Sequence, residues 1–250
     1  MIPRHAYFYW DARGPQMTLL RRRGIDSFRE LNPDWELTIL DGADIPIEGT
    51  DIVAIANRSD WARYKALGEA GGFYFDTDTI FIRPIPETWL AADVALQVYP
   101  SGEIGGIGAM GASEKGRAFF GDLKALCAVT VATQDVLGYQ SLGIKLFWTI
   151  SECLPSQAQI RTIGQYCERA GYRFVPIPMQ ALLPVEWRSP EYVWLDKHPV
   201  AIGEDVIGIH WYGGDHLSRL MEQKIGRDWT ESSACIVAKA YRGEYVAQHA

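Results

Sequence analysis

Residues 59–81 read SDWARYKALGEAGGFYFDTDTIF, which has the pattern of a helix, a two-glycine connection and an apolar strand that ends at two aspartates. Ser59 is a suitable helix N-cap, Asp60 would lie in the first turn, where the helix dipole favours an anion, and Gly71 suits the position after the C-cap. Alternation of helix and strand favours an α/β fold with a mostly parallel central sheet flanked by helices.

The rest of the chain continues this alternation. The apolar patterns predict strands over 5–10, 35–40, 93–99, 172–178 and 205–212, and helices over 17–31, 113–128 and 231–246. The short run 51–56 fits either a strand or a helix. Because the sequence contains no repeat, low-complexity segment or linker-like stretch, we expect a single domain over 1–250.

Composition narrows the range of partners. The chain has 250 residues, is 48% hydrophobic and carries a formal net charge of −7 without a long basic run, so a nucleic-acid partner is not expected. The sequence has no signal peptide and no stretch long enough to span a bilayer. The four cysteines form no CxxC pair and suit buried thiols in a reducing compartment. These features predict a cytoplasmic protein, with the inner face of the membrane as a further site of action.

Four charged residues are expected at one edge of the sheet. Asp60 and Arg63 are three residues apart and so share a helix face, and Asp76 and Asp78 follow the strand. An isolated surface pair like Asp60–Arg63 would contribute less than about 1 kcal/mol. The helix N-terminus and the carboxyl end of the strand, however, should lie on the same side of the sheet, where open α/β sheets bind ligands.

The two aspartates suit several functions. Carboxylate oxygens two residues apart suit Mg²⁺ or Mn²⁺ bound together with substrate phosphates, but a solvated strand end would also place acids here. A phosphohydrolase with a DxDx(T/V) motif is an alternative, although Ile80 occupies the Thr/Val position and several elements precede the motif. A non-catalytic module that binds sugar nucleotides is a third reading.

Three further segments have patterns that suit a binding role. Residues 106–111, GIGAMG, match GxGxxG but have the apolar character of a strand, so we expect close backbone packing there in place of a dinucleotide site. His210 follows an apolar strand and could be a metal ligand or a donor to a phosphate, or a strand-end histidine with no such role. Trp10 ends the first strand and could form a stacking platform for a base.

Together these segments resemble the GT-A fold glycosyltransferases with a DxD-containing sugar-binding region. The resemblance is to the retaining family 32 type, which is related to the clostridial toxin glucosyltransferases. Residues 59–85, SDWARYKALGEAGGFYFDTDTIFIRPI, follow this family's pattern nearly position for position. Four other segments are also similar, namely YFYWDA (7–12), ELNPDWELTILD (30–41), ALLPVEW (181–187) and IHWYGG (209–214).

The resemblance implies a hexosyltransferase that uses a nucleotide sugar with retention. UDP-hexose is favoured over GDP-mannose as donor, Mn²⁺ or Mg²⁺ as cofactor, and a glycan or glycolipid of polysaccharide biosynthesis as acceptor. Residues 1–100 would bind the nucleotide sugar and residues 101–250 would face the acceptor. The implied catalytic residues are Asp60, Arg63, Asp76 and Asp78; the donor would contact Trp10, Tyr9, Tyr64, Asp60, Arg63 and Trp211; and the metal ligands would be Asp76, Asp78 and His210.

Overall fold

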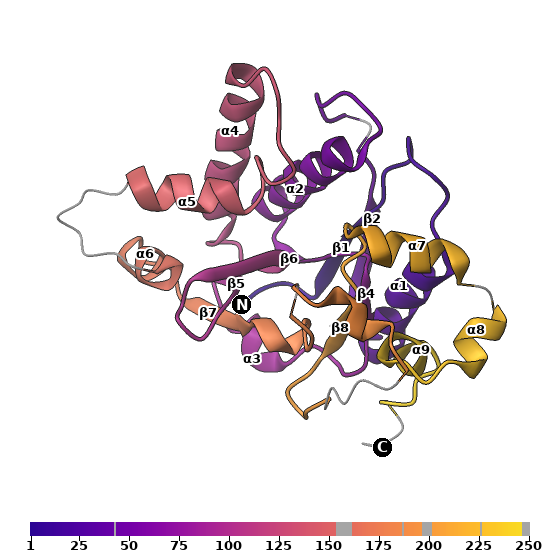
Figure 1. Cartoon of the computed structure of the whole chain (residues 1–250). Helices are drawn as coiled ribbons and strands as arrows, with labels where there is room; N and C mark the ends of the chain where they lie inside the picture. Colours follow the sequence, from indigo (N-terminus) through magenta and orange to yellow (C-terminus); the bar gives the residue numbers. More distant parts are fainter. Residues whose placement is uncertain (43, 154–161, 187, 197–201, 226, 247–250) are drawn as a thin grey trace. The chain divides into compact units, whose positions relative to one another are not determined.

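A computed structural model gives the fold and describes all residues except 43, 154–161, 187, 197–201, 226 and 247–250 (Figure 1). The chain forms two compact units, which are described separately. Unit 1 comprises Met1–Pro15, Trp35–Asp76 and Pro86–Pro178, and unit 2 comprises Gln16–Asp34, Thr77–Ile85 and Met179–Ala250.

Unit 1 is built around a six-stranded sheet in the order β2-β1-β3-β6-β5-β7. Its strands are β1 (His5–Tyr9), β2 (Glu36–Leu40), β3 (Gly72–Phe75), β5 (Val94–Val98), β6 (Ile104–Ala112) and β7 (Phe174–Pro178). β1 runs parallel to β2 and β3, and β5 runs parallel to β7. β6 is antiparallel to both of its neighbours. The predicted mixed α/β architecture with a mostly parallel sheet is therefore confirmed.

Helices pack around this sheet and bury its apolar side chains. The helices of unit 1 are α2 (Ile52–Glu69), α3 (Glu87–Leu90), α4 (Arg117–Thr133), α5 (Ile144–Cys153) and α6 (Ile163–Arg169). Figure 1 shows α2 and α4 on the same side of the sheet. The core beneath them combines helix residues such as Leu67 and Phe120 with strand residues such as Leu96 and Met110, all of them fully buried.

Unit 2 contains a small antiparallel sheet of β4 (Thr79–Phe81) and β8 (Gly208–His210), in which Thr79 pairs with His210. Its helices are α1 (Leu19–Leu31), α7 (His216–Lys224), α8 (Arg227–Ser232) and α9 (Ile236–Tyr241), with short 3-10 turns η2 (Met179–Ala181) and η3 (Pro190–Val193). A separate core forms here around the fully buried Trp211. Pairing of β8 with β4 places His210 opposite Thr79, the residue that directly follows the DxD segment.

The helix before β3 begins earlier than the sequence predicts. Ser59 is not an N-cap, because α2 starts at Ile52 and Asp51 caps it by accepting a hydrogen bond from the Ala54 N–H at 2.8 Å. The ambiguous run 51–56 is therefore helix. The other end agrees with the prediction, since Gly71 follows the C-cap with φ +73° and its N–H bonds the Leu67 carbonyl.

Two other helix boundaries also differ from prediction. The helix expected over 113–128 begins at Arg117, because the Ser113 hydroxyl accepts the Gly116 N–H in a turn before it. The helix expected over 231–246 is split into α8 and α9. Asp196 accepts hydrogen bonds from the Ser233 hydroxyl and the Ala234 N–H, and Cys235 then caps α9.

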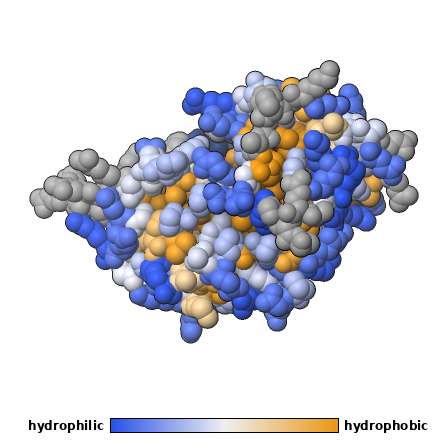
Figure 2. Space-filling view, turned by 90° about the horizontal axis from the view of Figure 1, so that it is seen from below, coloured by the Kyte–Doolittle hydropathy of each residue, from blue (hydrophilic) through white to orange (hydrophobic). Residues whose placement is uncertain are grey.

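The described residues contain no helix with the length and apolar character needed to cross a membrane. Figure 2 shows a face on which apolar side chains gather between hydrophilic ones.

Cys127, Cys167 and Cys235 are buried free thiols, as expected. The side chain of Cys153 lies outside the described part of the chain.

Candidate active site

Arg63 lies between two carboxylates in unit 1. Its Nη2 atom is 3.1 Å from Asp60 Oδ1 and 3.2 Å from Asp76 Oδ1. A strand advances about 3.3 Å per residue and a helix about 1.5 Å. The four residues of β3 therefore span the same length as about two turns of α2, which runs in the opposite direction. The end of β3 therefore meets the middle of α2. The predicted convergence of these three residues is correct, although the helix N-terminus is not what produces it.

Hydrogen bonds hold the Arg63 guanidinium in place. Its Nη2 also donates to the Ser59 hydroxyl at 2.8 Å, and its Nη1 donates to the Ile107 carbonyl. The guanidinium carbon lies 4.3 Å from the centre of the Tyr74 ring, whose hydroxyl donates to Asp76 Oδ1 at 3.1 Å. Arg63 is thus oriented from several directions and presents a fixed, charged fork beside Asp76.

Asp60 shares this cation but has an unusual protonation equilibrium. It is only 4% exposed, and burial raises the pKa of Asp60 to about 7, with Arg63 opposing the shift and Asp76 adding to it. One guanidinium is shared between two carboxylates here, so Asp60 is not fully ionised near pH 7. Gly143 stands where any Cβ would come 2.8 Å from Asp60 Oδ2, which keeps side-chain atoms away from this carboxylate.

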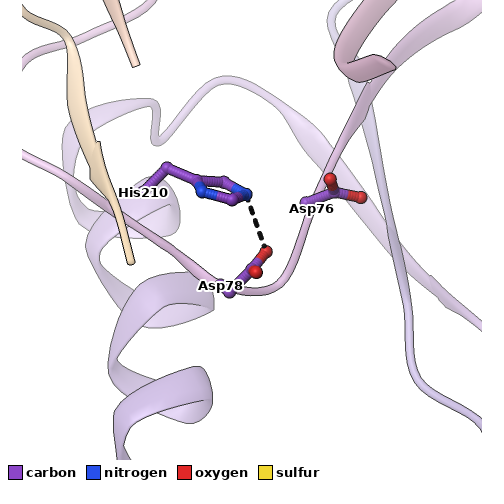
Figure 3. Close-up of side chains that lie close together, drawn as sticks. All are labelled: Asp76, Asp78 and His210. Atoms are coloured by element: carbon purple, nitrogen blue, oxygen red, sulfur yellow. Dashed lines mark ion pairs between the residues drawn. The ribbon is translucent and has the colours of Figure 1, made fainter. Parts of the chain in front are cut away.

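Asp78 and His210 are paired in unit 2, with 3.2 Å between Asp78 Oδ1 and His210 Nε2 (Figure 3). The opposite ring atom, Nδ1, accepts a hydrogen bond from the Tyr212 N–H at 3.1 Å. We therefore assign the ring proton of neutral His210 to Nε2, from which it is donated to Asp78. Tyr212 holds this position with a left-handed backbone, φ +56°, a conformation that costs free energy in residues other than glycine.

A polar network keeps Asp78 ionised. Burial alone raises the pKa of Asp78, but His210, Arg21 and the Gly213 N–H, which bonds Oδ2 at 2.6 Å, together hold the pKa well below its usual value. Arg21 is fixed in turn by a two-point ion pair with Glu222, with distances of 2.7 and 3.1 Å. The carboxylate of Asp78 is therefore charged in the folded protein and available as a hard ligand.

Asp76, Asp78 and His210 could hold a metal ion. Each offers one ligand atom, and these atoms all lie within 4.8 Å of one another (Figure 3). Two carboxylate oxygens and an imidazole suit Mn²⁺ and similar divalent ions. This is the set of metal ligands that the resemblance implies.

The aromatic residues assigned to donor binding have different surroundings. Tyr9 is 5% exposed and donates to Asp11, and Trp10 is partly exposed and donates from its indole N–H to the Pro15 carbonyl. Tyr64 and Trp211 are fully buried among core side chains. All four remain predicted donor contacts, and Tyr9 and Trp10 lie at the end of β1. Trp187 of the ALLPVEW segment lies outside the described residues.

Several residues of the site carry no sequence signal. The Ser59 hydroxyl, the Tyr74 hydroxyl and the Ile107 carbonyl support Arg63 or Asp76. In the sequence, however, Ser59 has the pattern of a helix cap and Tyr74 lies within the apolar run of a strand. Arg21 and Glu222 contact each other across 201 positions of the chain. Only the GGIGAMG pattern indicated that a backbone approaches closely here, and β6 does carry that close approach.

The chain is similar to known proteins both in sequence and in fold. Residues 18–96 match the family described as "Glycosyltransferase sugar-binding region containing DXD motif". Among solved structures, the chain is similar to a glycosyltransferase involved in the glycosylation of the major capsid of PBCV-1, with 13% identity, a TM-score of 0.50, and coverage of 88% of this chain and 99% of that one. The comparison with curated proteins found no match.

Two further structures are more distant. The galactosyltransferase LgtC in complex with donor and acceptor sugar analogs has 11% identity and a TM-score of 0.43, and the match covers 91% of this chain and 99% of that chain. The PaToxG glycosyltransferase has 14% identity and a TM-score of 0.41, and the match covers 60% of this chain and 70% of that chain.

The central sheet with its flanking helices defines the class of protein: this chain has the GT-A fold, as its similarity to the PBCV-1 enzyme shows. The family match is more specific, because residues 18–96 enclose Asp60, Arg63, Asp76 and Asp78. The match over residues 18–96 and the GT-A fold confirm the sequence-based resemblance to the glycosyltransferases with a DXD-containing sugar-binding region.

Proposed function

We propose that this protein is a divalent-metal-dependent glycosyltransferase that moves a hexose from a UDP- or GDP-sugar to an acceptor with retention of anomeric configuration. The observation that carries the proposal is the position of Arg63, held between Asp60 and Asp76 two residues before Asp78. The Arg63 guanidinium and the Asp60 carboxylate, fixed beside the DxD pair, suit a neutral, hydroxyl-rich sugar joined to a charged diphosphate.

The residues present fit a hard divalent ion. Asp78 is ionised by its surroundings, and Asp76 and His210 offer ligand atoms nearby. These three residues would hold Mn²⁺ or Mg²⁺. Such an ion supplies positive charge where the nucleoside diphosphate leaves.

The remaining roles fall to the protein's own side chains. Asp60 and Arg63 are proposed to hydrogen-bond the hydroxyls of the donor sugar, which orients the anomeric carbon and lowers the entropic part of the barrier. Tyr9 and Trp10, at the end of β1, are proposed to contact the nucleotide base. No carboxylate is assigned as a covalent nucleophile. A glycan or glycolipid acceptor and a cytoplasmic location complete the proposal.

The test is a panel of UDP-Glc, UDP-Gal, UDP-GlcNAc and GDP-Man, each measured for binding and slow donor hydrolysis with Mn²⁺ and again with EDTA. We expect one donor to bind and hydrolyse with Mn²⁺ and neither to bind well nor to hydrolyse after chelation. If no donor binds, or if EDTA changes nothing, the proposed function is wrong.

A further inference from the structure

Strand β6 is irregular where it passes the site. On β5, Leu96 pairs with Met110 but Gln97 pairs with Gly106, so Ile107–Ala109 leave the regular ladder between these strands. Bulges of this kind bend a strand and redirect its groups, often beside active sites.

The polar backbone groups of this bulge are used by the site. The Ile107 carbonyl accepts from Arg63, and the Gly108 carbonyl accepts the Asp76 N–H at 2.8 Å. The Ala109 N–H donates to Gln97 Oε1 at 2.9 Å. The Gln97 side-chain oxygen therefore takes the place of the backbone carbonyl that would accept this N–H in a regular sheet. This structural role involves Oε1 only and leaves Nε2 unexplained.

The other end of the amide has no partner. Gln97 is 1% exposed, and its Nε2 atom makes no hydrogen bond within the described part of the chain. Exchanging the two amide atoms does not help, because Nε2 would then face the Ala109 N–H, which is also a donor. An unpaired buried donor costs about 1–3 kcal/mol, so a native protein that keeps one needs a reason for it.

The amide lies beside Asp76. A Cβ built on Gly108 would come 2.7 Å from Asp76 Oδ2 and 3.4 Å from Gln97 Oε1. The carboxylate and the amide therefore approach the same point on one side of β6, and glycine leaves that point free of side-chain atoms. A hydroxyl group bound nearby could donate to Asp76 and accept from Gln97 Nε2. A phosphate oxygen would instead be repelled by the carboxylate.

We propose that Gln97 is a specificity-determining residue whose Nε2 donates a hydrogen bond to a hydroxyl of the transferred sugar. This inference rests on the proposed function and deepens it. The unpaired donor of the free protein is satisfied when the sugar binds, so Gln97 recognises the sugar and not the nucleoside diphosphate.

The test compares two ligands in two variants, by calorimetry with Mn²⁺. The ligands are the tightest-binding donor of UDP-Glc, UDP-Gal, UDP-GlcNAc and GDP-Man, and its nucleoside diphosphate alone. Gln97→Met removes the whole amide, whereas Gln97→Glu keeps the acceptor for the Ala109 N–H and removes only the donor. Gln223→Met, on the exposed face of α7, is the matched control.

We expect Gln97→Met to bind the donor about tenfold more weakly and the nucleoside diphosphate within about twofold of wild type, as for the loss of one hydrogen bond of roughly 1.4 kcal/mol. Gln97→Glu should also lose donor affinity relative to the diphosphate. Equal losses for both ligands, or no loss, would overturn the assignment. If wild type binds neither ligand, the proposed function itself fails, which is a different result.

Discussion

Arg63 contacts Asp76 at 3.2 Å from the middle of the helix that precedes β3, and the same guanidinium atom reaches Asp60 one turn back on that helix. This buried cation, shared between two acids, connects helix α2 to the first aspartate of the DxD segment. We expect both the stability and the proposed chemistry of this part of the chain to depend on it.

Removing the shared cation should destabilise the fold. Arg63→Met leaves two carboxylates without their partner, one of them buried, and should lower the free energy of unfolding by about 3 kcal/mol. Arg29→Met is a matched control, since Asp26 and Arg29 form an ion pair of the same i, i+3 spacing on an exposed face and should lose less than about 1 kcal/mol. Urea unfolding measures both. Similar losses in the two variants would show that the Arg63 cluster adds nothing beyond a surface pair.

Asp60 should make stability depend on pH. Its pKa of about 7 in the folded protein is above the value of about 4 for an unfolded chain. The neutral acid therefore favours folding, and this stabilisation is complete below pH 4 and is lost as the pH rises to 7. With EDTA present, the unfolding free energy of wild type relative to Asp60→Asn should fall by up to about 1.4 kcal/mol per pH unit across this range and level off above it. A constant difference between the two proteins would contradict the raised pKa.

Gly108 should be intolerant of a side chain. In Gly108→Ala, the new Cβ would come 2.7 Å from Asp76 Oδ2, so the carboxylate must move. We expect at least a tenfold loss of donor turnover with the fold retained. Gly121→Ala is the control, because a Cβ at this position meets nothing within 4 Å. Gly121 also lies in helix α4, where alanine is favoured over glycine. Full turnover in Gly108→Ala would mean that the position of Asp76 does not matter.

The sequence was enough to predict the convergence of Asp60, Arg63 and Asp76, because a short connection forces an antiparallel helix and strand to lie side by side. It misplaced the start of that helix, since Asp51 and Ser59 are both good caps and a six-residue apolar run does not distinguish helix from strand. In the structure Asp51 caps the helix by accepting the Ala54 N–H, and Ala54 is buried in the core of unit 1.

Contacts between distant segments could not be predicted in the same way. The role of Gln97 depends on a bulge in the neighbouring strand, and nothing in VALQVY indicates which register β5 and β6 adopt. The Arg21–Glu222 pair likewise joins α1 and α7. Such pairs depend on tertiary structure and leave no periodic pattern in the sequence.

His210 should change tautomer when an ion binds. In the metal-free protein the Tyr212 N–H faces Nδ1, so the proton of the neutral ring lies on Nε2. If Nε2 becomes a ligand, the proton must lie on Nδ1 and the bond from Tyr212 must break. Nitrogen-15 NMR of the histidine rings, without metal and with diamagnetic Mg²⁺, should therefore report a switch at His210. The same tautomer in both states would exclude Nε2 of His210 as a ligand atom.

In the proposed function, the carboxylate of Asp78 supports metal-dependent sugar transfer. The most direct measurement is the rate of donor hydrolysis by Asp78→Asn with Mn²⁺. Asp26→Asn, at an exposed position, is the control. The proposal predicts a loss of at least about 100-fold for Asp78→Asn, as for removal of an electrostatic element of the transition state, and wild-type rates for Asp26→Asn. Wild-type turnover in Asp78→Asn would contradict the account.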